Sequence, residues 1–151
     1  MIIALGSDHG AFELKNIIIE HLQQKGIKTI DCGTNSVDSC DYSDYAQKVC
    51  ALVNNGEATL GILVCGTGIG MSMAANTIAG IRCALCGDVF SAKATRSHND
   101  ANVLALGARV VGVGLALEIV DAYLGTPFSG EQRHARRIEK VMKLETNKSL
   151  Q

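Results

Sequence analysis

Five short apolar runs recur along this chain of 151 residues, and longer segments with the periodicity of amphipathic helices separate them. The runs are residues 2–7, 27–31, 60–64, 81–86 and 102–106. Strands of five or six residues that alternate with helices pair in parallel through right-handed crossovers. The pattern therefore predicts a three-layer α/β/α sandwich with a five-stranded parallel, Rossmann-like sheet, in a single domain that spans residues 1–151.

Helices are expected between these strands and after the last one. The predicted helical segments are residues 11–22, 41–54, 69–76, 88–98 and 115–124. Asp8, Asp41 or Ser43, and Asp88 stand where a helix start favours an acid or a hydroxyl. A final helix, residues 130–145, is polar for a core element, and we expect it to pack against a neighbouring subunit.

Composition excludes several functional classes. The net charge is −1 and 19% of the residues are charged, which gives no basic surface for nucleic acid. No apolar run reaches 18 residues and no basic leader precedes residues 2–7, so we expect no membrane segment and a cytoplasmic protein. Six cysteines in such a chain indicate free thiols. Cys83 and Cys86 fall on one strand and point to opposite faces, so no metal site is expected there.

A glycine-rich turn follows the third apolar run and leads into a helix. Gly66, Gly68 and Gly70 alternate with Thr67 and Ile69, directly after Cys65. Free backbone N–H groups at such a turn suit an anion, and a thiol placed there is favoured as a thiolate that can act as a base. The dinucleotide fingerprint is broken, because it requires glycine at the position of Met71. The alternative is structural: the glycines allow close packing, and Cys65 is a small core residue.

Parallel strands bring further polar residues to the same edge of the sheet. Ligands of open α/β sheets lie beyond the carboxyl ends of the strands, where Asp8, His9 and the turn after Cys65 converge, with Tyr42 just beyond the second strand. His98 precedes the fifth strand, so it belongs to the opposite edge unless a neighbouring subunit supplies it.

Each of these polar residues also has a structural alternative. His9 can simply end a strand, and His98, Asn99 and Asp100 form a plausible polar turn. Arg133 and Arg137 are four apart on one helix face, a spacing that can hold a phosphate, yet surface arginines are usually only solvated.

Taken together, the motifs resemble a known family. They are residues 7–10 (SDHG), 65–70 (CGTGIG), 80–82 (GIR), 98–102 (HNDAN), 107–112 (GARVVG) and the arginines from Arg133 to Arg137. In this order they are similar to the sugar-phosphate isomerases that include type B ribose-5-phosphate isomerase and the galactose- and allose-6-phosphate isomerases.

The resemblance implies an aldose–ketose isomerase that interconverts D-ribose 5-phosphate and D-ribulose 5-phosphate, in the non-oxidative pentose phosphate pathway. The reaction proceeds by ring opening and a cis-enediolate, without a metal or an organic cofactor. By the same resemblance, Cys65 is the base that removes the C2 proton, and Thr67 positions or protonates the O1 and O2 oxygens. The amides of the turn stabilise the enediolate, and they belong to Gly66, Gly68, Ile69 and Gly70.

The resemblance also assigns the remaining site residues. His98 opens the furanose ring, while Asp8, Tyr42 and Asn99 hold the ring oxygen and hydroxyls. The residues similar to the phosphate clamp are His9, Arg109, Arg133 and Arg137, with His134 assisting. In this family a homodimer shares its active sites between chains, and a tetramer is possible. An isomerase of allose or galactose 6-phosphate and a noncatalytic sugar-phosphate-binding module stay open as alternatives.

Overall fold

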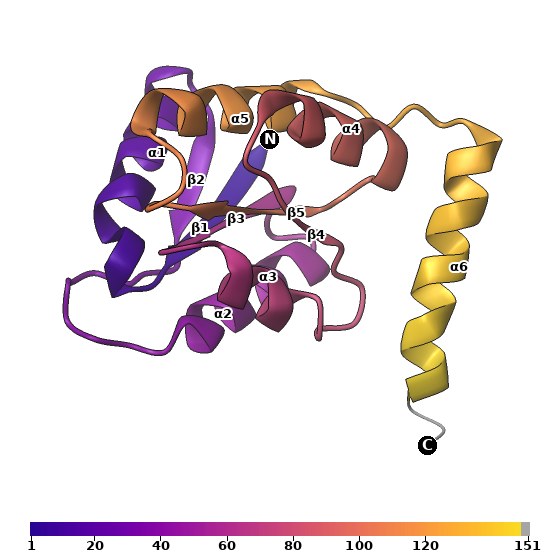
Figure 1. The fold of residues 1–151 in the computed structure, drawn as a ribbon, viewed down its shortest axis with the longest axis horizontal. Coiled ribbons are helices and arrows are strands. Elements are labelled where there is room, and N and C mark those ends of the chain that lie inside the picture. Colours follow the sequence, from indigo (N-terminus) through magenta and orange to yellow (C-terminus); the bar gives the residue numbers. More distant parts are fainter. Residues whose placement is uncertain (149–151) are drawn as a thin grey trace.

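The structure is a computed structural model that describes residues 1–148, and it contains the predicted parallel sheet (Figure 1). Its strands are β1 (Ile2–Ser7), β2 (Lys28–Asp31), β3 (Leu60–Cys65), β4 (Cys83–Leu85) and β5 (Val103–Gly107). They pair in the order β2-β1-β3-β5-β4, and every pairing is parallel. The predicted five-stranded sheet is confirmed; residues 149–151 of the predicted domain lie outside the described part.

Helices cover both faces of this sheet (Figure 1). One face carries α1 (Phe12–Gln24), α4 (Val89–Asn99) and α5 (Val113–Gly125), and the other carries α2 (Tyr42–Asn54) and the short α3 (Ile69–Ala75). A turn of 3₁₀ helix, His9–Ala11, precedes α1. The predicted three-layer sandwich is therefore confirmed.

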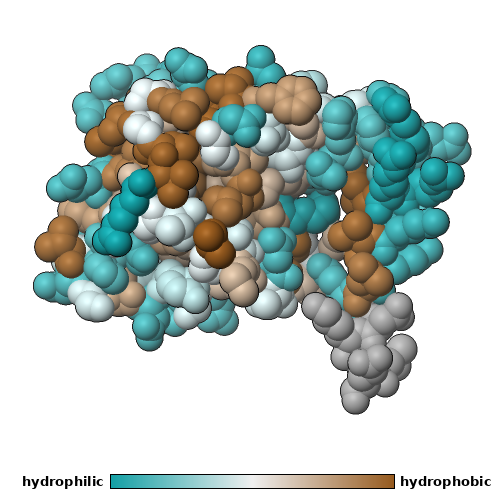
Figure 2. Space-filling view, viewed as in Figure 1, coloured by the Kyte–Doolittle hydropathy of each residue, from teal (hydrophilic) through white to brown (hydrophobic). Residues whose placement is uncertain are grey.

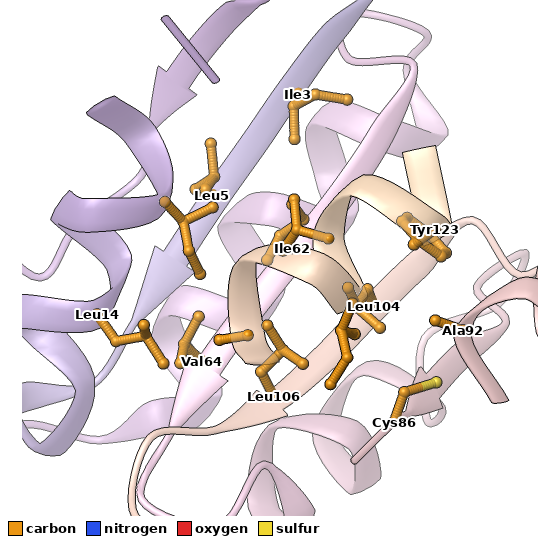
Figure 3. Close-up of a cluster of buried hydrophobic side chains, with 14 of the residues drawn as sticks. Ile3, Leu5, Leu14, Ile62, Val64, Cys86, Ala92, Leu104, Leu106 and Tyr123 are labelled. Carbon is orange, nitrogen blue, oxygen red and sulfur yellow. The ribbon is translucent and has the colours of Figure 1, made fainter. Parts of the chain in front are cut away.

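Two apolar clusters, one on each face, hold the layers together. Side chains alternate along each strand, so Ile3 and Leu5 of β1 enter the first cluster while Ala4 enters the second. Figure 3 shows the first cluster, in which Ile62, Leu104 and neighbouring strand residues meet side chains of the helices. Fully burying one such aliphatic side chain contributes about 1.5–3 kcal/mol, so the central strands dominate the stability of the sheet.

The predicted helix starts are correct in position but differ in their bonds. The Asp8 and Asp88 carboxylates accept N–H bonds from Gly10 and Ser91 respectively. Asp41 is the residue before α2, yet its side chain makes no capping bond. Ser43 lies inside that helix, so Asp41 is the one of the two predicted residues that occupies the N-cap position.

Strand β4 is shorter at both ends than the predicted run of residues 81–86, and one side chain binds the residues that precede it. The Asn102 amide accepts the Arg82 N–H at 2.8 Å through Oδ1 and donates to the Gly80 carbonyl at 2.9 Å through Nδ2. The Arg82 carbonyl also accepts backbone N–H bonds from Asn102 and Val103, at 3.1 and 3.3 Å, and the strand begins at Cys83. Cys86 enters the first cluster and Cys83 packs on the second, which confirms that they point to opposite faces.

The last helix, α6 (Gln132–Lys148), stands beside the sandwich and is attached near its two ends (Figure 1). His134 contacts His98 of α4, and near the far end Glu145 accepts an N–H bond from Gly80 at 3.1 Å. A cleft of about 450 Å³ lies between α6 and the edge of the sheet at β4. Figure 2 shows a hydrophobic stripe on the side of α6 that faces this cleft, which is lined by Ile138, Val141 and Leu144.

The helices of residues 1–148 include none with the length and apolarity that crossing a lipid bilayer requires.

Candidate active site

The turn after β3 brings a backbone N–H group onto the Cys65 sulfur. Gly68 adopts a φ of +77°, which favours glycine, and its N–H donates to Cys65 Sγ at 3.1 Å. The sulfur therefore lies against a backbone donor of the turn. Because α3 has only seven residues, its helix dipole is smaller than the sequence pattern suggests.

Hydrogen bonds between backbones gather two further segments around this turn. Ala108 N–H donates to the Cys65 carbonyl and Arg109 N–H to the Gly66 carbonyl, both at 2.9 Å. Asp8 N–H donates to the Val64 carbonyl at 3.3 Å. The predicted residues Asp8, Cys65 and Arg109 therefore lie at one edge of the sheet, and they are fixed by the strands that carry them.

His9 and Arg109 line a cavity of about 490 Å³ beside this edge. The starts of α1 and α5 line the same cavity, so two sets of free helix N–H groups adjoin the two basic side chains. The backbone N–H of Cys40 donates to His9 Nδ1 at 3.3 Å, which leaves Nε2 to carry the proton of a neutral ring. His9 is therefore arranged as a hydrogen-bond donor, in a cavity whose charged side chains are Arg109 and Glu13.

Tyr42, at the start of α2, packs directly on the turn. A Cβ atom built on Gly70 would lie 2.8 Å from the Tyr42 ring, so a larger residue at position 70 would displace the ring. The Tyr42 side chain is partly exposed, at 44%. Tyr42 and the turn thus share one surface, as the sequence predicts.

A second group of predicted residues lies elsewhere. Helix α4 runs from the carboxyl ends of the strands to their amino ends, and His98 and Asn99 are at its last turn. Asn99 and Arg137 line the cleft beside α6, and Arg133 forms an ion pair with Glu131 at 2.7 Å. The described chain therefore does not bring these residues to Cys65, which agrees with the prediction that His98 belongs to the opposite edge.

We call these two sets the cysteine group and the histidine group. The cysteine group comprises Asp8, His9, Tyr42, Cys65, Gly66, Thr67, Gly68, Ile69, Gly70 and Arg109. The histidine group comprises His98, Asn99, Arg133 and Arg137.

Four of the six cysteines have a raised thiol pKa. Burial raises the pKa of Cys50 and of Cys86 to about 11, and it also raises the pKa values of Cys32 and Cys83. Cys65 is itself only 4% exposed and packs in the second cluster, so the structural alternative describes part of its surroundings. Its sulfur also accepts the N–H bond from Gly68.

Two contacts of the site could not be expected from the sequence. Cys40 fixes the His9 ring through its backbone, and Ser129 Oγ lies 2.9 Å from His134 Nδ1. Neither residue stands in a motif, and the contacts join segments that only the fold brings together. Within residues 1–148, no cluster of three or more His, Cys, Asp or Glu side chains has the geometry to hold a metal ion.

Comparison with known proteins decides the family. Residues 3–141 match the family described as ribose/galactose isomerase. The chain belongs to this family. The resemblance that the motifs indicate is therefore confirmed.

Individual members of the family are similar along almost their whole length. Ribose-5-phosphate isomerase B of Escherichia coli is 48% identical, and the match covers 97% of this chain and 98% of that protein. A D-erythrulose-4-phosphate isomerase of Pectobacterium atrosepticum is 44% identical, over 92% of this chain and 91% of its own length. The solved structure of Clostridium thermocellum ribose-5-phosphate isomerase B superposes with a TM-score of 0.95 at 48% identity, covering 97% of this chain and 99% of the other.

Proposed function

We propose that this member of the ribose/galactose isomerase family interconverts D-ribose 5-phosphate and D-ribulose 5-phosphate. The observation that carries the proposal is the hydrogen bond from Gly68 N–H to Cys65 Sγ, in a turn that also adjoins Arg109 and the cavity of His9. A base, a set of free amides and an anion site are the three parts that an aldose–ketose isomerisation of a sugar phosphate requires.

The first step opens the furanose ring. In the proposed mechanism the ring oxygen receives a proton and the O1 hydroxyl loses one, which breaks the bond between C1 and the ring oxygen and leaves an aldehyde. His98 exchanges these protons, because imidazole serves as both acid and base near neutral pH. Asp8, Tyr42 and Asn99 hold the ring oxygen and the hydroxyl groups.

The second step moves a hydrogen from C2 to C1. The Cys65 thiolate removes the C2 proton, and the negative charge passes to O1 of a cis-enediolate. Amides of the turn stabilise that oxygen, and one well-placed donor is worth about 3 kcal/mol in the transition state. Thr67, whose hydroxyl accepts the Ile69 N–H at 3.3 Å, transfers the proton between O1 and O2. The Cys65 thiol then returns its proton to C1, and the ketose is complete.

The phosphate is bound by residues of both groups. His9 and Arg109 line the cavity of the cysteine group, and Arg133 and Arg137 add two guanidinium groups. One guanidinium group can bind two phosphate oxygens at once. His9 and the three arginines together therefore match a phosphate dianion.

We further propose that two copies of the chain complete each site. His98 lies at the edge opposite Cys65, and a two-fold axis that brings the histidine group of one copy to the cysteine group of the other forms two equal sites. Apolar side chains around the turn support such an interface, since Ile69, Met73 and Phe90 are all more than half exposed. Association of two dimers into a tetramer stays a prediction.

The pentose phosphate and hexose phosphate alternatives differ in the number of carbons in the sugar. Relatives with closely similar sequences carry the names of a five-carbon and a four-carbon phosphate isomerase, so family membership alone does not fix the number of carbons. The test is a comparison of kcat/KM for ribose 5-phosphate, allose 6-phosphate and galactose 6-phosphate. We expect the highest value for ribose 5-phosphate. A higher value for either hexose phosphate supports the hexose alternative, and binding without turnover of any of them supports a noncatalytic module.

A further inference from the structure

The His98 ring rests on a second imidazole. The centroids of His98 and His134 are 4.4 Å apart and the rings are tilted by 43°. His98 is exposed, whereas His134 is only 4% exposed although the neighbouring Arg133 and Ala135 are exposed. One face of the His98 ring therefore packs against the buried His134 ring, and the rest of the His98 ring is accessible to solvent.

His134 is itself held in place by the linker between α5 and α6. Ser129 Oγ accepts the Glu131 N–H at 3.2 Å and lies 2.9 Å from His134 Nδ1. Donation of the Ser129 hydroxyl hydrogen to Nδ1 satisfies both groups and leaves the His134 proton on Nε2. Ser129 N–H in turn donates to the Ser97 carbonyl at 3.0 Å, beside His98 in the sequence. These contacts form a closed loop from the last turn of α4 to the first turn of α6 and back.

Burial and the surrounding charges together favour a neutral His134 ring. Burial lowers its pKa, and the adjacent His98, Arg133 and Arg137 lower it further, while Glu131 acts in the opposite direction. A neutral His134 can lie against His98 in either protonation state without repulsion between like charges. The support is therefore compatible with a His98 ring that gains and loses a proton.

We propose that His134, fixed by Ser129, is a positioning residue that orients the His98 ring for the ring-opening step; this inference rests on the proposed function. The contact also attaches α6 to α4, so a purely structural role is the competing explanation. The two roles differ in which chemical steps they affect. Loss of an attachment disturbs α6, with its two arginines, and impairs every substrate, whereas loss of His98 orientation impairs only the step that opens a ring.

Ribulose 5-phosphate separates these steps. Its C5 oxygen carries the phosphate, so this ketose cannot close to a furanose, and its proton abstraction needs no ring opening. Deuterium uptake from D₂O into ribulose 5-phosphate therefore reports on phosphate binding and on proton transfer at Cys65, without the ring-opening step. We expect His134→Phe, which keeps a ring but loses Nδ1, to lower kcat for ribose 5-phosphate about tenfold or more, while deuterium uptake changes less than about twofold.

Two further variants keep the test decisive if the buried phenylalanine impairs folding. Ser129→Ala removes only the hydroxyl and is expected to have an effect of the same kind. The double variant is expected to be no slower than the slower single variant, because both substitutions break one chain of contacts. The matched control is His21→Phe, since His21 Nε2 also lies 2.9 Å from an oxygen, in Asp121, and His21 belongs to neither group. Its rates are expected to equal those of the unmodified chain.

Equal losses in turnover and in deuterium uptake in both single variants overturn the positioning role, and unchanged rates in both variants also overturn it. A chain with unmodified sequence that neither turns over ribose 5-phosphate nor exchanges deuterium overturns the proposed function, and this inference with it.

Discussion

The cysteine group and the histidine group are held in place by different kinds of bonds. Around Cys65 the bonds join backbone to backbone: the carbonyl groups of residues 64–66 accept N–H bonds from residues 8, 108 and 109. Around His98 one backbone bond, from Ser129 N–H to the Ser97 carbonyl, is joined by side-chain contacts of His134, of the Ser129 hydroxyl, and of an Arg82 guanidinium that donates to the Asp100 carbonyl. The backbone of the sheet thus fixes the cysteine group, whereas side chains at helix ends help to fix the histidine group. Side-chain substitutions can therefore change the position of the histidine group more easily than that of the cysteine group.

The largest expected effect tests the chemistry of the cysteine group. Cys65→Ala removes the proposed base, and we expect kcat to fall by about a thousandfold or more while the fold is retained. The matched control is Cys50→Ala, because Cys50 is fully buried in the same cluster and has no role in the proposed mechanism. Turnover assays and circular dichroism on both variants provide the measurement. Turnover of Cys65→Ala at the unmodified rate would remove the proposed base.

A mixing experiment tests whether the two groups come from different chains. Cys65→Ala and His98→Asn are each expected to be inactive. In a mixed dimer, one site then contains both substitutions and the other contains neither. Unfolding and refolding an equimolar mixture is expected to restore about a quarter of the unmodified activity, because half of the dimers are mixed and each has one intact site. A mixture that forms mixed dimers, detected by distinct affinity tags, but recovers no activity contradicts the shared site.

A smaller effect is expected from the phosphate-binding part of the histidine group. Arg137→Ala removes one guanidinium group, and we expect KM for ribose 5-phosphate to rise about tenfold with kcat little changed, since the phosphate is bound equally in the ground and transition states. Arg136→Ala is the matched control, because it removes an exposed arginine from the neighbouring position on the same helix. Steady-state kinetics distinguish the two, and an equal rise in KM for both variants would indicate a general charge effect.

The smallest effect on turnover is expected from the ion pair between Lys15 and Asp31. Lys15 is fully buried, and its Nζ lies 2.6 and 2.7 Å from the two Asp31 carboxylate oxygens. Asp31 also accepts the Gly33 N–H at 2.9 Å, where the connection toward Cys40 begins. Because the Asp31 side chain is 37% exposed, Lys15→Met leaves a carboxylate that water can still reach.

We therefore expect Lys15→Met to lower the free energy of unfolding by about 2 kcal/mol, less than for a completely buried pair, with turnover nearly unchanged. Urea unfolding measures this change. Lys25→Met is the control, since Lys25 forms an exposed pair with Asp121 and its removal is expected to cost at most about 1 kcal/mol. Equal costs for both variants would show that burial of Lys15 adds nothing.

The sequence predicts the cysteine group well because its signal is local. Residues 60–70 contain the apolar strand, the cysteine and the alternating glycines in one continuous segment, and the rule for parallel sheets then places Asp8 and His9 beside it. The same rule correctly places His98 at the other edge.

Other features lie beyond prediction because they depend on single side chains far apart in the sequence. The Asn102 side chain bonds residues 80 and 82, and β4 begins only at Cys83, although the apolar run alone indicates a longer strand. The contact between His98 and His134 joins residues on two helices, and no spacing rule connects them. Propensities describe neighbours along the chain, whereas these contacts are set by how α4 and α6 pack.

The bond between Ser129 and Ser97 has a consequence for changes in chain length. It fixes the linker between α5 and α6 at one point, and His134 fixes the helix that follows only five residues later. An inserted residue in this interval would rotate α6 by about 100° about its axis and turn Arg133 and Arg137 away from their present side. A change of preference to a longer or shorter sugar is therefore expected to arise from side-chain substitutions in this segment. Insertions and deletions there would move Arg133 and Arg137 away from His98.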